Sequence, residues 1–248
     1  MNAPKRKRVL VAGIYLPDRE NHALAISDEL SSSADWQVDL CWGAVGSRPP
    51  PEELRARTHI ISPQRVSKFE LLNRLLAEAP LDDYEYLMIT DDDIELPAGF
   101  VDDYLDVVTR RRFHLAQPAR THRSYIDHHF VAQLVGVEAR RTRFVEIGPL
   151  FSLQRDAFPV LLPFDEAAPM GWGLDCVWPT LIESAGLTLG IVDATPVTHA
   201  LRKPVALYDY DETNASMQQF LQDQPHLSAE DRFLSLETWP APAAKTDR

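Results

Sequence analysis

Short apolar runs alternate with amphipathic helical patterns over the first 112 residues, and this alternation limits the possible folds more than any other feature of the chain. The apolar runs are bounded by charges or turn residues, which is typical of buried strands. Between them, apolar side chains recur at helical spacing. We predict strands at 9–16, 36–45, 59–61 and 86–89, and helices at 21–30, 68–79 and 97–112. Such an alternation predicts a mostly parallel sheet flanked by helices.

The remainder of the chain is less regular. We expect shorter strands at 114–119, at 143–153 with an interruption at Gly148-Pro149, and at 189–199, and helices at 171–184 and 206–221. The prediction is a single α/β domain over residues 1–210. Its first half, about 8–113, carries the parallel sheet, and its smaller, mixed half is about 114–205. Residues 211–248 are predicted to hold a closing helix and, from Trp239, a disordered tail.

Acidic residues outnumber basic ones, with 37 Asp and Glu against 25 Lys and Arg, and the formal net charge is −12. Such a surface repels polyanions, so we expect no nucleic-acid partner. A small anionic ligand would need local positive charge or a metal ion to receive it.

The two cysteines, Cys41 and Cys176, are far apart and are not spaced as metal ligands. We therefore expect neither a disulfide framework nor structural zinc, and a reducing compartment, the cytoplasm, fits best. The chain starts with a basic stretch before an apolar run, as signal peptides do. Because Pro17 cuts that run short and it lacks a small-residue cleavage site, we interpret it as the first strand. No segment is apolar for long enough to predict a membrane span.

Three consecutive carboxylates, Asp91 to Asp93, follow the predicted strand at 86–89. Ligands of open α/β sheets bind beyond the carboxyl ends of the strands. The predicted strand would place its three carboxylates at that edge of the sheet. Side chains alternate along a strand, so Asp91 and Asp93 should share a side while Asp92 points away and has a structural role. Two carboxylates about 6 Å apart repel by about 3 kcal/mol at an effective dielectric near 20. A proton, a basic side chain or a divalent cation should offset that repulsion. The alternative is a solvated acidic turn.

The segment GWGLD at Gly171 to Asp175 is a second candidate. Its glycines permit close approach of the backbone to a ligand, and Trp172 offers a flat apolar face. Asp175 would stand at a helix start, where a carboxylate is favoured electrostatically. The alternative is an N-cap Asp beside a core Trp. His199, at the end of the strand predicted at 189–199, could supply a nitrogen ligand to a metal held by the carboxylates, or be structural.

Other polar residues are weaker candidates. Lys68 and Asn73 flank the helix before the acidic strand end and could contact a base, ribose or phosphate. Arg143 belongs to a basic cluster and is a phosphate candidate. His128 and His129 are adjacent, so on an extended backbone at most one of them faces a given site. Solvated surface positions are the alternative for the charged residues.

Together these residues resemble a glycosyltransferase of the GT-A fold. In that fold a DxD motif at the end of a central strand holds a divalent metal against the diphosphate of a nucleotide sugar. KFELLNRLL followed by YEYLMITDDDIELP is similar to the layout of the fold's nucleotide half. GWGLD resembles a segment of galactosyltransferase-like members in which an acidic residue is the catalytic base. His199 matches the late histidine that completes the metal site.

A closer resemblance, over about residues 8–205, is to the family called domain of unknown function 707. The shared motifs are DDD at Asp91 to Asp93, QPA at Gln117 to Ala119, the pair His128 and His129, GWGLD at Gly171 to Asp175, and IVDATPVTH at Ile191 to His199. The galactosyltransferase segment continues with further acidic residues, whereas Cys176 and Val177 follow Asp175 here. Which family carboxylate Asp175 replaces is therefore left open.

The resemblance implies a GT-A-like single domain with a Rossmann-like nucleotide half and a mixed acceptor half. It implies a metal-dependent glycosyltransferase that moves a sugar from a nucleoside-diphosphate sugar to the hydroxyl of a carbohydrate or other acceptor, with inversion. Mn²⁺ or Mg²⁺ would be held by Asp91, Asp93 and His199, and Asp175 would take the acceptor's proton. The expected nucleotide contacts are Lys68, Asn73, Asp91 and Asp92, and the expected substrate contacts are Gly171, Trp172, Gly173, His129 and Arg143.

Two other functions are compatible with the same residues. A metal-dependent phosphoesterase or nucleotidyltransferase would use the carboxylates without a sugar acceptor. A non-catalytic sugar-binding module would keep the fold with a degraded site, and would bind without need of Mn²⁺.

Overall fold

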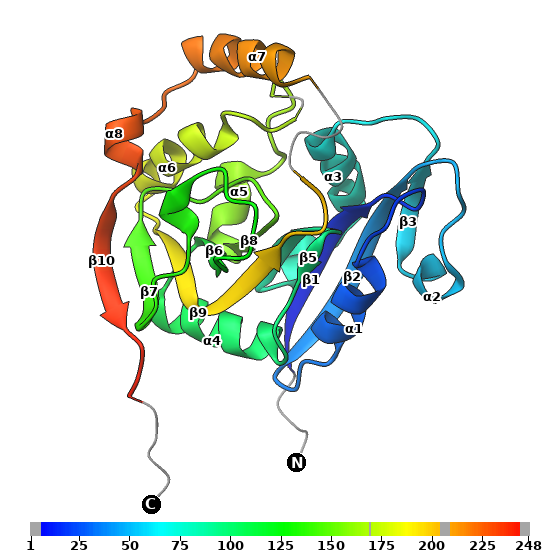
Figure 1. Cartoon of the computed structure of the whole chain (residues 1–248), viewed down its shortest axis with the longest axis horizontal. Coiled ribbons are helices and arrows are strands. Elements are labelled where there is room, and N and C mark those ends of the chain that lie inside the picture. Colours follow the sequence, from blue (N-terminus) through cyan, green and yellow to red (C-terminus); the bar gives the residue numbers. More distant parts are fainter. Residues whose placement is uncertain (1–5, 169, 204–208, 244–248) are drawn as a thin grey trace, which may run out of the picture.

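The computed structural model describes residues 6–168, 170–203 and 209–243. Its strands are β1 (Lys7–Tyr15), β2 (Trp36–Val45), β3 (Thr58–Ser62), β4 (Tyr86–Asp91), β5 (Ile94–Glu95), β6 (Leu115–Arg120), β7 (Val137–Thr142), β8 (Leu150–Gln154), β9 (Leu189–His199) and β10 (Ser235–Pro240). Its α-helices are α1 (Ala23–Ser31), α2 (Glu52–Arg55), α3 (Lys68–Ala77), α4 (Phe100–Arg111), α5 (Phe158–Leu161), α6 (Leu174–Ser184), α7 (Tyr210–Gln222) and α8 (Ala229–Arg232). Figure 1 shows their arrangement.

One sheet runs through the domain in the order β10-β7-β9-β6-β8-β4-β1-β2-β3, and β5 pairs separately with β9. The strands β3, β2, β1 and β4 are parallel, as the sequence predicts for the first half. Beyond β4, strands β6 and β9 pair parallel, whereas β8, β7 and β10 pair antiparallel with their neighbours. The sheet as a whole is therefore mixed rather than mostly parallel.

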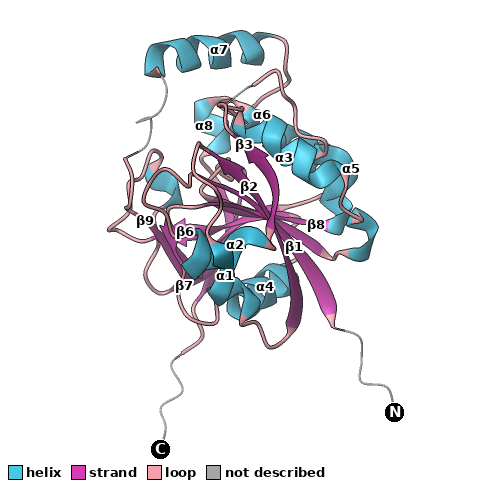
Figure 2. Cartoon of the chain, turned by 90° about the vertical axis from the view of Figure 1, so that its right-hand side faces the viewer, coloured by secondary structure: helices cyan, strands magenta, loops and turns pink. Residues whose placement is uncertain are grey.

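Helices cover both faces of the sheet, so the domain has three layers (Figure 2). Strand β1 shows why its sequence is apolar throughout. Val9 and Val11 pack in a core with α1, α2 and α4, and Leu10 and Ala12 pack in a core with α3, α5 and α6. Burial on both faces is typical of the central strands of α/β sheets.

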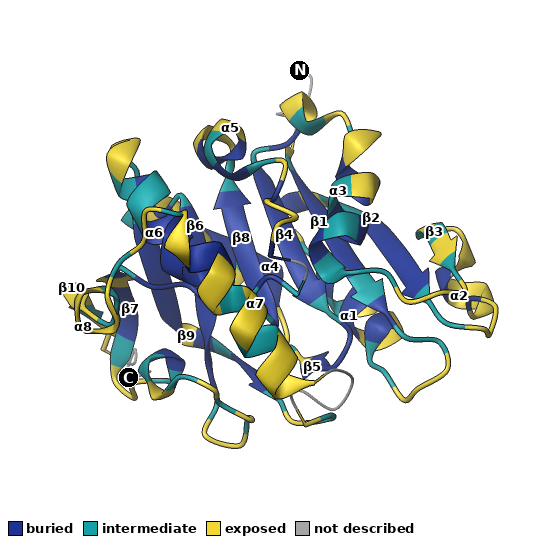
Figure 3. Cartoon of the chain, turned by 90° about the horizontal axis from the view of Figure 1, so that it is seen from above, coloured by how far each residue is buried: buried dark blue, intermediate teal, exposed yellow. Residues whose placement is uncertain are grey.

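The C-terminal segment adds the last strand to the sheet. Strand β10 pairs antiparallel with β7, with Trp239 opposite Ala139. Trp239 and Pro240 thus belong to a strand, where the sequence predicts the start of a disordered tail, and residues 244–248 of that tail lie outside the described residues. The helix predicted at 206–221 is observed as α7, and residues 206–208 lie outside the described residues. Helix α7 lies above the edge where β4 and β9 end, with much of its outer side exposed (Figure 3). None of the described helices is both long and apolar enough to cross a membrane.

Candidate functional site

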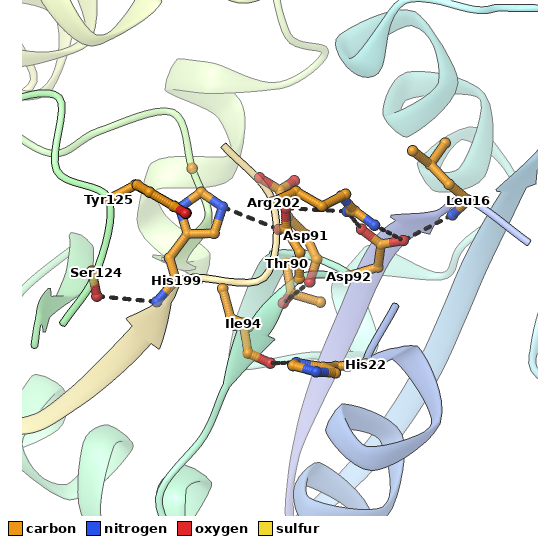
Figure 4. Close-up of polar contacts among 12 residues, drawn as sticks. Leu16, His22, Thr90, Asp91, Asp92, Ile94, Ser124, Tyr125, His199 and Arg202 are labelled. Atoms are coloured by element: carbon orange, nitrogen blue, oxygen red, sulfur yellow. Dashed lines mark hydrogen bonds and ion pairs between the residues drawn. The ribbon is translucent and has the colours of Figure 1, made fainter. Parts of the chain in front are cut away.

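The acidic triplet lies where the central strand ends. Asp91 is the last residue of β4, and the chain bends at Asp92 and Asp93 before β5. Strand β5 then pairs with β9, with Ile94 opposite His199. This pairing places His199 Nε2 3.2 Å from Asp93 Oδ1. Residues more than 100 positions apart in the chain thereby meet at one edge of the sheet, as the sequence predicts (Figure 4).

Each carboxylate of the triplet has a cationic partner. Lys68 Nζ lies 2.6 Å from Asp91 Oδ1. Arg202 pairs with both of the others: its Nη2 contacts Asp92 Oδ1 and lies 3.1 Å from Asp93 Oδ2. Basic side chains therefore offset the mutual repulsion of the triplet.

Asp92 is the structural member of the triplet. It is 3% exposed, and the backbone N–H of Leu16 at the end of the β1 strand donates to its Oδ2 at 2.8 Å. Burial raises the pKa of Asp92 to about 6, although the Arg202 and Leu16 contacts act in the opposite direction. Burial also acts to raise the pKa of Asp93, but the hydrogen bond and charge of His199, with Arg202 and Lys68, outweigh it and lower that pKa.

Asp91 and Asp93 do not act as the matched pair that strand alternation predicts. The strand ends at Asp91, so the alternation stops there. Asp91 faces Lys68, and Asp93 faces His199. Among the described residues, no group of three or more His, Cys, Asp or Glu side chains is arranged to hold a metal ion. Of the three predicted metal ligands, Asp93 and His199 lie next to each other in space, and Asp91 does not join them.

The donor set of Asp93 and His199 fits a divalent cation that takes its other ligands from phosphate and water. Mg²⁺ commonly binds through one or two carboxylates plus substrate phosphates, and imidazole is a usual ligand of transition metals. Arg120 Nη1 donates to His199 Nδ1 at 3.1 Å, and because arginine cannot accept, Nε2 carries the imidazole proton toward Asp93. If His199 bound a metal through Nε2, the proton would have to leave that nitrogen. The tautomer of His199 therefore depends on the hydrogen bond from Arg120.

A buried polar network extends from His199 into the second half of the domain. The Arg120 guanidinium also contacts Glu146 and donates to the Gly148 carbonyl at 2.6 Å. The other oxygen of the Glu146 carboxylate lies 2.9 Å from His128 Nδ1. Arg120 and Glu146 are each at least 95% buried by side chain. Five residues thus form one hydrogen-bonded chain from Asp93 to His128.

Asp175 lies in the first turn of α6, as the sequence predicts, but Gly173 is the N-cap residue. The Asp175 carboxyl is 8% exposed, and the Cys176 thiol donates to its Oδ1 at 3.6 Å. Burial raises the pKa of Asp175, and the nearby charges of His128 and Arg232 lower it only in part. Asp175 and His128 therefore act on each other electrostatically.

The sequence predicts that the glycines of GWGLD let the backbone come close to a ligand, but their close neighbours in the structure are protein side chains. Gly171 and Gly173 have φ of +81° and +98°. A Cβ on Gly171 would lie 2.0 Å from Phe69 Cε2, and one on Gly173 would lie 3.0 Å from Phe220 Cδ1. Trp172 packs edge-on against Tyr210 of α7, with centroids 5.2 Å apart. The GWG turn is thus held between α3 and α7.

Two of the predicted contacts are engaged elsewhere, and a third is exposed outside the buried network. The Asn73 amide donates to the Phe164 carbonyl and to Glu166, and accepts from Phe164 N–H, so it holds the loop after α5. Arg143 forms a two-pronged ion pair with Glu183, at 2.7 Å for each contact. His129 is exposed, and it is His128 that joins the buried network.

Sequence reasoning missed Arg120, Glu146 and Arg202. Arg120 directly follows the predicted QPA strand, and a charge at the end of a buried strand is a usable signal. Arg202 stands three residues after His199, which places it near the site once His199 is located. Glu146 carries no local signal, because only the tertiary fold brings it to Arg120.

In comparison with known proteins, no protein-family model and no curated protein sequence matches the chain. The resemblance to domain of unknown function 707 therefore stays a prediction. The structure is similar to the crystal structure of GalNAc-T7 with UDP, GalNAc and Mn²⁺, at a TM-score of 0.56 and 11% sequence identity. The match covers 87% of this chain and 48% of that one, so the chain spans about half of the solved structure it matches. At this identity the similarity speaks to the fold alone, and the chain has a GT-A-like fold.

Proposed function

We propose that the protein is a metal-dependent glycosyltransferase that moves a sugar from a nucleoside-diphosphate sugar to an acceptor hydroxyl. The observation that carries the proposal is the Asp93–His199 pair beside Lys68 and Arg202, at the carboxyl edge of a GT-A-like sheet. Two metal-type donors and two cations at one strand end suit a diphosphate better than any neutral ligand. The solved structure with a similar fold contains UDP and Mn²⁺, which supports the same ligand class.

On the donor side, Asp93 and His199 would hold Mn²⁺ or Mg²⁺, and the bound ion would act as a Lewis acid toward the departing diphosphate. Lys68 and Arg202 offset two of the three negative charges of the triplet, and a bound divalent cation would supply the further positive charge that an anionic donor needs in a protein of net charge −12. Asp91 is partly exposed beside Lys68 and remains our candidate for the ribose. Asp92 holds Arg202 and the backbone of Leu16 in place.

On the acceptor side, the reaction needs a wall for the sugar and a base for its hydroxyl proton. Trp172 remains the candidate wall, held by Tyr210. Asp175 is the carboxyl group that the sequence predicts as this base, and the expected effect of Asp175→Asn is loss of transfer with nucleotide binding kept. Loss of transfer and of nucleotide binding together would point to a structural role for Asp175.

A thermal-shift screen of nucleoside diphosphates and nucleotide sugars, with and without Mn²⁺, tests the proposal. We expect at least one nucleotide to raise the melting temperature more with Mn²⁺ than without it, because the cation bridges phosphate and Asp93. In Asp93→Asn this Mn²⁺-dependent increment should disappear. Absence of any metal-dependent shift in the wild type would defeat the proposal, and hydrolysis of the nucleotide sugar without an acceptor would favour a phosphoesterase.

A further inference from the structure

A buried carboxylate orients the imidazole of His128. Glu146 Oε1 lies 2.9 Å from His128 Nδ1, and Oε2 of the same carboxylate contacts the Arg120 guanidinium. The backbone N–H of Glu146 also donates to Gln117 Oε1 at 2.6 Å. Glu146 is 5% exposed by side chain, so its position is fixed by these contacts. A carboxylate that accepts from one ring nitrogen fixes the tautomer and leaves the other nitrogen able to accept a proton.

The imidazole is the more exposed member of this pair. His128 is 34% exposed by side chain, and no described residue hydrogen-bonds to its Nε2. Its ring packs against Phe144 and Phe233, with centroids 5.0 and 5.3 Å away, which limits its rotation. Asp175, in contrast, is 8% exposed. Of the two groups, His128 is the one that a hydroxyl on a bound molecule can reach.

His128 also belongs to the candidate site. One guanidinium, that of Arg120, holds both Glu146 and the imidazole of His199. The base candidate and the donor side are therefore connected by hydrogen bonds through the buried side chains of Arg120 and Glu146.

We propose that His128 is the general base of the reaction, oriented by Glu146 and supported by the charge of Asp175. The assignment rests on the proposed function. His128 Nε2 takes the proton of the acceptor hydroxyl while the acceptor oxygen forms a bond to the anomeric carbon. The bond from that carbon to the donor phosphate breaks, and its electron pair leaves on the nucleoside diphosphate.

The charges around His128 agree with this role. Burial acts to lower the pKa of His128, but the hydrogen bond and charge of Glu146 and the charge of Asp175 outweigh it, and the pKa is raised. Arg232, the remaining charged neighbour, acts in the lowering direction. A raised pKa makes the imidazole a stronger base, and it acts as a base above that pKa.

Activity of His128→Ala with and without added imidazole tests the role. We expect kcat to fall by about 10²- to 10⁴-fold, the range for loss of a general base, with metal-dependent nucleotide binding kept. Free imidazole should restore part of the rate, which a purely structural loss would not allow. His122→Gln, an exposed histidine of the same loop, is the matched control and should keep the wild-type rate.

The Glu146→Gln variant supplies a second readout. Removing this carboxylate should lower the pKa of His128 in an NMR titration and move the acidic limb of the kcat pH profile to lower pH by the same amount. An unchanged limb, or His128→Ala with near-wild-type kcat while Asp175→Asn is inactive, overturns the assignment to His128. A wild-type protein that binds and turns over no nucleotide sugar overturns the proposed function itself, and the role of His128 with it.

Discussion

Arg202 neutralises two buried carboxylates at once, and this makes it the residue on which the acidic site most depends. Its side chain is 19% exposed, and it contacts Asp92 and Asp93 together. In Arg202→Gln, both carboxylates lose their shared cation. We expect the free energy of unfolding to fall by about 3 kcal/mol, because removing one partner of a buried ion pair leaves uncompensated charge. Urea denaturation measures the loss.

A divalent cation should replace part of the positive charge that Arg202 places beside Asp92 and Asp93. Mn²⁺ is therefore expected to stabilise Arg202→Gln more than it stabilises the wild type, since it binds the folded variant's unpaired carboxylates. Arg123→Gln removes one exposed arginine without touching the triplet and serves as the control. Equal stabilisation of all three proteins by Mn²⁺ would contradict the expectation that the ion takes the place of Arg202.

At the residue scale, the sequence identified the acidic triplet, His199 and Asp175 because each follows a strong local pattern. Asp91 to Asp93 end an apolar run, and His199 ends another. The partners of these residues had no such pattern. Glu146 sits in an irregular segment between β7 and β8, and its contacts with Arg120 and His128 arise only when β6 and the loop after it fold together.

The turn before α6 depends on Gly171 for two separate reasons. Its φ is +81°, and a Cβ would lie 2.0 Å from the Phe69 ring. Gly186, after the same helix, has φ of +72° with nothing within 4 Å of a Cβ. Gly186→Ala should therefore cost only the left-handed backbone penalty, about 1–2 kcal/mol.

Gly171→Ala should cost that penalty plus about 1–3 kcal/mol for displacing Phe69 from a buried cluster. Phe69 packs there with Phe164 and Trp178, so it cannot move freely. Chemical denaturation of the two variants side by side checks the difference. Equal losses would mean that the turn yields and that the contact with Phe69 is not needed.

Elements of the first half were predictable because each carries its own periodicity. The apolar run at 86–89 and the helical stripe at 68–79 correspond to β4 and α3 within two residues. The strand predicted at 143–153 was right in part: the interruption at Gly148-Pro149 and the strand after it, Leu150–Gln154, are observed, but 143–147 is not strand. Local pattern could not reveal that β8 enters the sheet antiparallel beside β4, because strand pairing is a long-range property.

Over the whole molecule, the C-terminal segment closes the second half of the domain around His128. Phe233, between α8 and β10, packs on the ring of His128 and on Phe144. Strand β10 then pairs with β7, and Trp239 packs against Phe113 and over the Arg111 guanidinium. Trp239 is thus an anchor for the segment that limits the rotation of His128.

Trp239→Ala should weaken that anchor and disturb the candidate base at a distance. We expect a loss of about 1–2 kcal/mol in the free energy of unfolding, since the indole is partly buried and its stacking on Arg111 is lost. Leu236→Ala, at an exposed position of the same strand, should change stability by no more than about 0.5 kcal/mol.

If β10 positions Phe233, the NMR signals of the His128 ring should broaden or shift in Trp239→Ala and not in Leu236→Ala. Transfer activity should fall in the former under conditions where it stays folded. A destabilised Trp239→Ala whose His128 signals and kcat match the wild type would show that β10 stabilises the sheet without holding the site, and that Phe233 keeps its place without the Trp239 anchor.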